Sequence, residues 1–380
     1  MKENKKVNVM YHGRKVGTIA LHQGRFGAFA YDREWLSDGF SISPFSLPLE
    51  SRVFIPKIDP FDGIFGVFAD SLPDGWGRVL VDRLMLQNHM DPYEMGNLDR
   101  LAIVGNSGMG ALCYEPDYHF PTEETLLDLD RIALDCRKIL NSESADNLDE
   151  LFRLGGSSGG ARPKIMTQIN GEEWIIKFPS SYDGANAGKQ EYEYSLCARE
   201  CGIDMTETRL FPSSICDGYF GTRRFDRRKN KNGVFEKIHM ISVAAVLETS
   251  HRIPNLDYDI LMKLTLELTK DFSEIEKLYR LMCFNVFAHN RDDHSKNFTY
   301  LYEEKENRWI LSPAYDMTYS HSIGGEHATT VHGNGKNPKI SDMLAVAENI
   351  GMDKKKAECI AEQVRECVEH RLGKYLRQNK

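Results

Sequence analysis

The sequence predicts a mixed α+β protein built from two units, and three observations support this prediction. The chain has 380 residues, 41% of them hydrophobic, which is enough for a sizeable core and for more than one domain of roughly 100–200 residues. Short segments that alternate apolar and polar residues lie near the N-terminus, whereas long apolar-periodic segments dominate the second half. An acidic stretch at 123–150 separates the two parts.

Residues 1–122 are the first predicted unit, a small α+β unit. Alternation on both sides of a turn at His12–Arg14 predicts a β-hairpin, because a half-buried strand hides every second side chain. The predicted elements are the strands Val7–Tyr11, Val16–Leu21 and Phe26–Tyr31 and the helix Arg78–Gln87. Residues 123–150 are expected to form a helix followed by a linker around 141–147.

Residues 151–380 are the second predicted unit, which opens with strands and continues mainly as helices. Asn170-Gly171 is a type I′ turn signal between two alternating runs, so a second hairpin is predicted there. Gly202 is typical of the residue that ends a helix. The predicted elements are the strands 164–168 and 174–178, the helices Gln190–Cys201, Tyr258–Leu268 and Ser273–Ala288, and a long C-terminal helical pattern over Ile340–Tyr375.

The composition argues against several classes of function. With 48 basic and 56 acidic side chains the net charge is −8, which disfavours broad capture of nucleic acid. The longest apolar runs fall short of the roughly 20 residues that span a membrane, and the polar start of the chain lacks the apolar core of a secretory signal. A cytoplasmic protein without membrane association is therefore expected. The eight cysteines show no CxxC spacing, so small buried side chains are expected, without a zinc cluster or a disulfide framework.

A glycine-rich loop followed by a hairpin and a lysine is the first constellation that could carry chemistry. The glycines of 155–161 let backbone N–H groups approach an anion closely, because no Cβ blocks the way. Lys177 could reach the oxygens of a polyphosphate, and Glu191 on the next helix could hold that lysine in place. A half-exposed lysine and a glutamate favoured by the helix N-terminus explain these two residues equally well. The similar run 105–110 has no lysine-bearing strand after it, which favours a structural turn.

The basic run Arg223–Lys229 has the composition of a small nucleic-acid patch. Charge runs are more often solvated, so a solvated strand end and turn is the preferred interpretation. Asp226 becomes of interest if a nucleotide ribose lies nearby.

The sharpest constellation is the polar cluster His289–Asn297, which follows directly on an apolar-periodic helix. Asp292 and Asn297 stand five positions apart, as do the aspartate and asparagine of the protein-kinase catalytic loop. Phosphoryl transfer needs a carboxylate to accept the hydroxyl proton, and an amide oxygen and a second carboxylate to hold magnesium. A hairpin predicted over 298–311 could carry Asp316 back beside Asn297.

The same cluster supports a second interpretation, a metal-dependent phosphoester hydrolase. His289, Asp292, Asp293 and His294 are all residue types that ligate transition metals. We rank this interpretation second because it leaves the glycine loop and Lys177 without a role.

Together these motifs resemble the HipA family of serine/threonine kinases, the toxins of bacterial HipBA-type toxin–antitoxin systems. The resemblance extends from about Val7 to Asp316, and its most specific part is the Asp-x-His-x-Lys-Asn signature at 292–297. Ser43–Leu49 and Phe68–Asp74 resemble the N-terminal subdomain of the family.

The resemblance implies a bilobal protein-kinase-like core with a small α+β N-terminal subdomain. That subdomain would be 1–122, and 123–150 would be a helix and linker. The kinase domain would be 151–380, with an N-lobe at about 151–245 and a C-lobe at about 246–380.

Roles of single residues also follow from the resemblance, by motif position. Asp292 would be the catalytic residue, and Asn297 and Asp316 would hold Mg²⁺. Ser157 falls where the family has a self-phosphorylated serine, and the adjacent Ser158 leaves that assignment open. The ATP-binding residues would be Gly159, Gly160, Ala161, Arg162, Pro163, Lys164, Lys177, Glu191, Arg223, Arg224, Phe225, Asp226, His294, Ser295, Lys296 and Tyr315.

The resemblance further implies an activity and partners. The protein would transfer the γ-phosphate of ATP to a protein serine or threonine, in known cases often on an aminoacyl-tRNA synthetase, and so arrest growth. A HipB-like DNA-binding antitoxin would bind it, and DNA contact would be indirect. Two other classes stay open: the metal-dependent hydrolase, and a kinase-like ATP-binding co-repressor without transferase activity.

Overall fold

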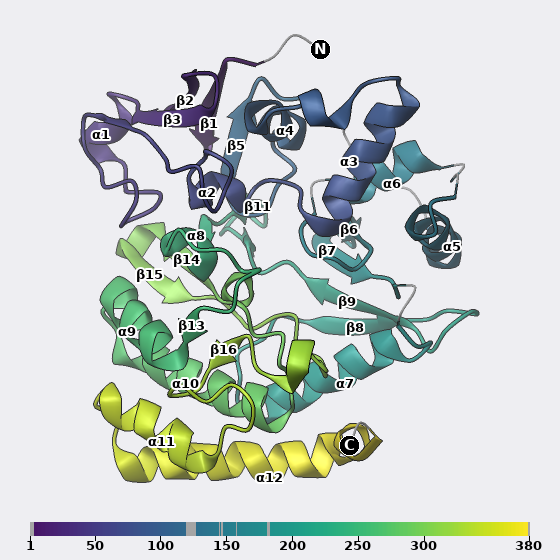
Figure 1. Cartoon of the computed structure of the whole chain (residues 1–380), viewed down its shortest axis with the longest axis vertical. Helices are drawn as coiled ribbons and strands as arrows, with labels where there is room; N and C mark the ends of the chain where they lie inside the picture. The colour runs from purple at the N-terminus through teal and green to yellow at the C-terminus, as the bar shows by residue number, and fades with distance from the viewer. Residues whose placement is uncertain are drawn as a thin grey trace. The chain divides into compact units, whose positions relative to one another are not determined.

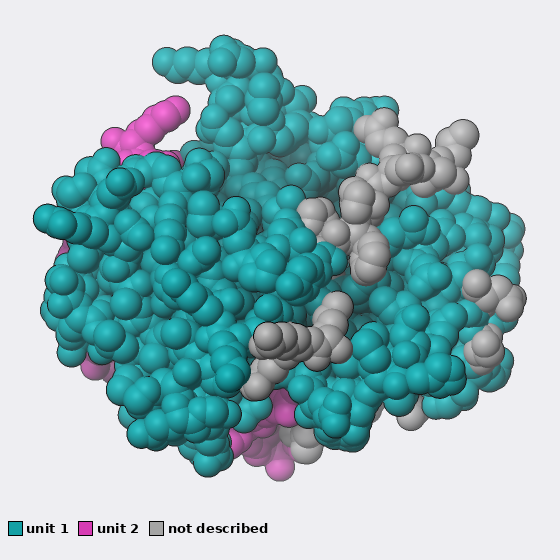
Figure 2. Space-filling view, turned by 90° about the horizontal axis from the view of Figure 1, so that it is seen from above, with its two compact units in different colours: residues 1–188, 209–241, 245–249 teal, residues 189–208, 242–244, 250–380 magenta. Residues whose placement is uncertain are grey.

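The computed structural model describes residues 4–118, 127–143, 145, 147–156, 158–180 and 183–378. The chain divides into two compact units, which Figure 2 distinguishes by colour. Unit 1 comprises residues 1–188, 209–241 and 245–249, and unit 2 comprises residues 189–208, 242–244 and 250–380. Helices and sheets occur in both units, so the predicted α+β class is confirmed.

Unit 1 opens with an antiparallel sheet in the strand order β4-β3-β2-β1-β5 (Figure 1). The predicted first hairpin is present, and Val7 lies opposite Ile19 in its register. Both side chains are fully buried, as alternation requires of one face of a strand. The strands are β1 (Lys6–Tyr11), β2 (Arg14–His22), β3 (Phe26–Tyr31), β4 (Val53–Phe54) and β5 (Leu112–Glu115).

The helices of unit 1 share a core with the sheet that follows them. Trp76 and Leu80 of α3 pack with Phe152 of α6 and with Ile165 and Ile176 of the hairpin β6–β7. Burying side chains of this size is the main favourable term for holding these elements together. The helices are α1 (Trp35–Asp38), α2 (Gly66–Ala69), α3 (Gly75–Gln87), α4 (Asn97–Val104), α5 (Leu129–Leu140) and α6 (Leu148–Gly155), with a 3-10 turn at Pro92–Glu94.

A second sheet of unit 1 carries the predicted glycine loop and lysine. Its strand order is β6-β7-β9-β8, and β6 and β7 are joined at Asn170-Gly171, where both residues have positive φ as a type I′ turn requires. A short hairpin, β10–β11, follows. The strands are β6 (Lys164–Ile169), β7 (Glu172–Lys177), β8 (Thr208–Phe211), β9 (Tyr219–Arg223), β10 (Arg227–Lys229) and β11 (Phe235–Lys237).

Unit 2 is mainly helical. The side chains of Asp257 and Asp271 each accept a hydrogen bond from the backbone two residues on, which fixes the starts of α9 and α10. The helices are α7 (Ala187–Glu200), α9 (Tyr258–Thr269), α10 (Phe272–Phe287), α11 (Ile340–Asn349) and α12 (Lys354–Gln378). The strands β13 (Leu256–Asp257), β14 (Thr299–Glu303), β15 (Arg308–Leu311) and β16 (Thr329–Thr330) lie here, with 3-10 turns at Ser295–Asn297, Glu304–Glu306 and Ile323–Gly325. The short β12 (Met240–Ser242) and α8 (Val243–Val246) fall where the chain passes between the units.

The helical pattern predicted over Ile340–Tyr375 is present as two helices, because Gly351 adopts a φ of 79° between α11 and α12. One expectation about secondary structure needs correction. The glycine loop expected over 155–161 begins inside α6, which ends at Gly155. Among the described helices, none is long and apolar enough to cross a membrane.

Candidate active site

The predicted catalytic cluster lies in a loop of unit 2 that begins where α10 ends. Asp292 is the exposed member, with 66% of its side chain accessible, and its Oδ1 lies 3.9 Å from Nε2 of His294. The side-chain amide of Asn297 donates to the backbone carbonyl of Asp292 over 2.6 Å. Because this bond uses the side-chain nitrogen of Asn297, the side-chain oxygen Oδ1 is the atom that could bind a cation. An amide oxygen suits a hard cation such as Mg²⁺, which prefers oxygen ligands.

Asp293 is the buried anchor of this loop. Its carboxylate, fully shielded from solvent, accepts hydrogen bonds from Tyr258 at 3.0 Å and from the backbone of Thr329 at 3.2 Å, and it pairs with His327 at 3.0 Å. Burial, together with the neighbouring charge of Asp293, raises the pKa of Tyr258 well above its usual value, so the phenol stays a donor. Asp293 thus points into the protein while its neighbour Asp292 points to solvent.

The predicted hairpin is present as β14–β15, and it brings the segment before Asp316 back to the loop. The Ser312 backbone amide donates to the carbonyl of Thr299 over 2.8 Å, and the Tyr315 hydroxyl donates to the carbonyl of Lys296 over 2.6 Å. Asp316 follows with a φ of 55°, a left-handed conformation that is uncommon for a residue with a side chain. Such strain persists only where the surroundings enforce it, and it concentrates at functional sites.

The four residues of the hydrolase interpretation do not converge. Asp293 belongs to its own buried network, whereas Asp292 lies beside His294 in the exposed part of the loop. Within the described residues, the one set of three or more His, Cys, Asp or Glu side chains close enough to share a metal ion consists of cysteines elsewhere in unit 2. The geometry therefore favours the first interpretation of the cluster.

The glycine loop of unit 1 packs against the start of α3. The Gly160 amide donates to the carboxylate of Asp74, and the Trp76 amide donates to the Gly160 carbonyl over 2.9 Å. A Cβ on Gly77 would lie 2.2 Å from the Ser158 carbonyl oxygen, so this close approach requires glycine there. An amide of the loop thus already donates to an anionic group, the Asp74 carboxylate.

Two lysines lie directly opposite each other beside this loop. Lys164 of β6 pairs with Lys177 of β7 in the antiparallel register, which places both side chains on one face. The Lys164 ammonium donates to the Gly159 carbonyl over 2.6 Å, and the Lys177 ammonium lies 5.6 Å from the centre of the Phe220 ring. The register thus brings two positively charged side chains to one face of the hairpin, beside the glycine loop.

The side chains of Arg224 and Asp226 have a structural role. Arg224, Asp226 and Arg227 form a buried ion cluster that holds the loop 105–110, where Arg224 donates to the Gly108 carbonyl over 2.9 Å and the Gly110 amide donates to Asp226 over 2.6 Å. Burial alone would raise the pKa of Asp226, but the two guanidinium groups outweigh it and hold that pKa well below its usual value. The run expected to be solvated is thus buried at these positions, and the loop 105–110 is the structural turn that was predicted.

The other predicted ATP-site residues are distributed as follows. Arg162 pairs with Asp183 at 3.0 Å, and Arg223 pairs with Glu172 at 3.1 Å. Glu191 is buried on α7. Ala161 is exposed, Phe225 half-buried, and Pro163 and Ser295 buried. Binding of a nucleotide by these residues stays a prediction.

The two candidate serines of the glycine loop differ. Ser158 is 3% exposed and its hydroxyl donates to the Gly155 carbonyl over 2.6 Å. Ser157 lies outside the described residues. A kinase therefore reaches the Ser158 hydroxyl only if this loop moves.

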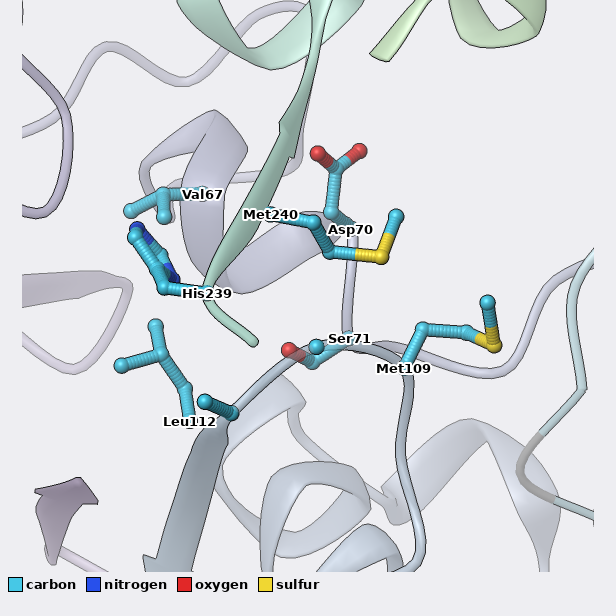
Figure 3. Close-up of a pocket in the computed structure, with 9 residues that line it drawn as sticks. Val67, Asp70, Ser71, Met109, Leu112, His239 and Met240 are labelled. Atoms are coloured by element: carbon cyan, nitrogen blue, oxygen red, sulfur yellow. The ribbon is translucent and has the colours of Figure 1, made fainter. Parts of the chain in front are cut away.

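A small cavity in unit 1 lies apart from the predicted residues. Figure 3 shows the side chains of Asp70, His239 and Met240 around it. Its volume of about 10 Å³ is at the lower limit for a single water molecule, so it is not a substrate site. Burial lowers the pKa of His239 to about 4, and its Nε2 lies 2.9 Å from the Ile42 carbonyl oxygen.

Comparison with known proteins decides the family. Residues 156–372 match the HipA-like C-terminal domain, and residues 7–115 match the HipA N-terminal domain. The chain belongs to the HipA family. The resemblance inferred from the motifs is thereby confirmed.

Three individual proteins resemble this chain in sequence or in structure. The putative kinase Y4mE of Sinorhizobium fredii is 26% identical over 342 residues, which cover 82% of this chain and 76% of that protein. HipA of Shewanella oneidensis, solved with HipB and its operator DNA, aligns with a TM-score of 0.71 at 14% identity over 97% of this chain and 90% of its own. The Helicobacter pylori kinase CtkA aligns with a TM-score of 0.36 at 14% identity, over 55% of this chain and 89% of its own. The match to HipA shows that this chain has the HipA fold.

A group that the sequence interpretation missed is the cysteine cluster of unit 2, formed by Cys197, Cys201 and Cys367. The signal available in the sequence was the four-residue spacing of Cys197 and Cys201, which places both on one helix face. Cys367 has no such signal, because only the packing of α12 brings it near.

Proposed function

We propose that this HipA-family protein is an ATP-dependent kinase that phosphorylates a serine or threonine hydroxyl of another protein. The observation that carries the proposal is the arrangement of the loop 289–297. Its one exposed carboxylate, Asp292, is held by Asn297 on a backbone that the buried Asp293 anchors. A catalytic base must be solvent-accessible yet fixed in position, and this loop provides both.

Each residue has a defined part in the proposed reaction. Asp292 accepts the proton of the attacking hydroxyl, which typically contributes about 10²–10⁴-fold to the rate. Lys164 and Lys177 bind phosphate oxygens, since the register places both side chains on one face of the hairpin beside the glycine loop. The backbone amides of the glycine loop add donors that do not depend on pH.

Magnesium is the metal that fits the remaining ligands. Asn297 presents its Oδ1 after its amide nitrogen has bonded to Asp292, and Asp316 contributes a carboxylate. An amide oxygen and a carboxylate match the oxygen preference of Mg²⁺ and offer nothing to a thiophilic ion. The bound ion would neutralise charge on the transferring phosphate.

Partners are proposed from the relatives. HipA of Shewanella oneidensis was solved with HipB and operator DNA, and a HipB-like antitoxin is the partner we propose for this chain. With a net charge of −8, this chain is poorly suited to bind DNA itself, so a basic DNA-binding partner would supply that contact. We propose a growth-arresting toxin whose substrate is a protein, an aminoacyl-tRNA synthetase being one candidate class.

Modification of the glycine loop is the regulatory part of the proposal. A phosphate on Ser157 or Ser158 would add a dianion beside the loop that binds ATP phosphates. We expect such a form to bind ATP more weakly. Tighter or unchanged ATP binding by the phosphorylated protein would contradict this part.

The test is incorporation of labelled phosphate from γ-labelled ATP and Mg²⁺ into the protein itself, followed by mass spectrometry of the phosphosites. Wild type should be labelled, and Asp292→Asn and Asp316→Asn should lose at least about 100-fold of the rate. Glu267→Gln, an exposed acid on α9 that pairs with Lys270, is the matched control and should retain full labelling. Equal labelling of all four proteins would refute the catalytic assignment.

Measurements of ATP binding distinguish the co-repressor alternative from the proposed kinase. A co-repressor without transferase activity would bind ATP in a calorimetric titration yet leave wild type unlabelled. In that case Asp292→Asn would bind ATP as wild type does and would change no measured rate.

A further inference from the structure

Three cysteines of unit 2 lie close together where the C-terminal end of α7 packs against α12. Cys197 lies on α7, Cys201 lies in the turn directly after the last residue of α7, and Cys367 lies on α12. Their sulfur atoms all lie within 4.8 Å of one another. Cys197 is 1% exposed and Cys201 is 5% exposed, whereas Cys367 is partly exposed. The cluster is therefore enclosed, with access from the side of α12.

Two ion pairs join α7 to the part of α12 that follows Cys367. Glu193 of α7 forms an ion pair with Lys374 of α12 at 2.5 Å, and Glu200 pairs with Arg371. The Cys367 sulfur lies 4.0 Å from the Cys197 carbonyl oxygen. The three thiols are thus held together by the packing of the two helices, before any ligand binds.

The spacing of the sulfur atoms matches a three-thiolate metal site. Three sulfurs at about 2.3 Å from one ion stand about 4 Å apart, so the observed limit of 4.8 Å leaves an inward movement of less than about 1 Å. Soft thiolates select thiophilic ions, chiefly Cu(I) and Zn²⁺. Zn²⁺ nearly always takes four protein ligands in a structural site, and no fourth His, Cys, Asp or Glu joins the group among the described residues. Three ligands therefore favour Cu(I).

The thiolate and not the thiol is the metal ligand, so an ion bound by these three sulfurs displaces their protons.

We propose that Cys197, Cys201 and Cys367 form a binding site for one Cu(I) ion. Binding replaces three S–H protons by three copper–sulfur bonds and releases those protons to solvent, without any change of oxidation state. The site ties α7 to α12 and is independent of the proposed kinase activity, because no residue of the cluster is among the candidate catalytic or nucleotide-binding residues.

The test is an anaerobic titration of the reduced full-length protein with Cu(I), in competition with a chromophoric Cu(I) chelator. Wild type should take up one equivalent, with a thiolate-to-copper charge-transfer band in the ultraviolet and a raised Tm. Cys367→Ser should weaken binding by more than the 10–100-fold that loss of an outer partner of a metal site costs. The control is Cys359→Ser, an exposed cysteine on the same helix, which should bind as wild type does.

Two results would overturn the proposal. One is a titration in which Cys367→Ser binds Cu(I) as wild type does, or in which Cys359→Ser and not Cys367→Ser loses Cu(I) binding. The other comes from X-ray absorption of the wild-type copper complex, which needs no variant and so does not depend on whether a substituted chain folds. Three sulfur neighbours support the site, whereas fewer than three, or nitrogen and oxygen neighbours, refute it.

Discussion

Replacing Asp226 by asparagine should cost more stability than any ion-pair substitution on the surface of this protein. The Asp226 carboxylate is fully buried and accepts four hydrogen bonds: two from Arg224 at 3.0 and 2.8 Å, one from Arg227 at 2.8 Å and one from the Gly110 amide at 2.6 Å. The substitution Asp226→Asn preserves the shape, removes the negative charge and turns one oxygen into a donor that faces guanidinium donors.

The expected magnitude follows from what remains buried. Among the residues that the structure describes, Glu173 would remain as the carboxylate partner of Arg224 and Arg227, at 3.1 and 2.9 Å, and its side chain is 27% exposed. Removing one partner of a buried ion pair typically costs about 3–5 kcal/mol. The pair Arg14–Asp38 offers the matched control, because both side chains are about half exposed or more, and Asp38→Asn should cost at most about 1 kcal/mol.

The assay is urea unfolding monitored by tryptophan fluorescence. For a slope of about 2–3 kcal/mol per M, a loss of about 4 kcal/mol lowers the midpoint by about 1–2 M. Asp226→Asn should show that shift, and Asp38→Asn should not. A loss below about 1 kcal/mol for Asp226→Asn, equal to that of the control, would show that the cluster does not hold the loop 105–110 as described.

Three further predictions concern the loops and the buried histidine. Gly77→Ala should lower the unfolding free energy by about 1–3 kcal/mol and raise the KM for ATP, because the added Cβ would overlap the Ser158 carbonyl oxygen. Val79→Ala on the same helix is the control. An unchanged KM and an unchanged stability of Gly77→Ala would contradict this prediction. Asp293→Asn should slow phosphate incorporation, because the anchor of the proposed catalytic loop is lost, and a rate equal to wild type would refute the anchoring role. The pKa of His239 is lowered from an ordinary 6.5 to about 4, so as the pH falls the unfolded chain binds a proton at this histidine before the folded chain does. The folded state should therefore lose up to about 3 kcal/mol of stability between pH 6.5 and pH 4. Urea midpoints between pH 7 and 4.5 should fall more steeply for wild type than for His239→Phe, and parallel slopes would contradict the assignment.

The local sequence was sufficient where the relevant interactions are local. Strand β3 has the bounds predicted for it, and β1, β2, β6 and β7 lie within a few residues of the predicted strands. Alternation and the Asn170-Gly171 turn determine such hairpins, because each residue's neighbours along the chain set its conformation and exposed face. The Asp-x-His-x-Lys-Asn signature sufficed to predict the family for the same reason, since all six of its positions lie in one loop.

Tertiary structure decided which of the polar residues are buried and with what partners. The sequence placed Asp226 near a nucleotide and the run 223–229 in solvent, yet packing against the distant loop 105–110 buries that carboxylate between two arginines. Asp293 and Asp292 are neighbours with identical side chains, and only contacts from Tyr258, His327 and Thr329 make one an anchor and leave the other exposed.

The sequence by itself determined the class of fold, the family and the residue types available for phosphoryl transfer. Only the tertiary structure brought Cys367 beside Cys197 and Cys201. The physical reason is the range of the interactions involved. Periodicity and turn chemistry act over a few residues, whereas burial, ion pairing and ligand geometry depend on groups that are far apart in the chain and meet only when it folds.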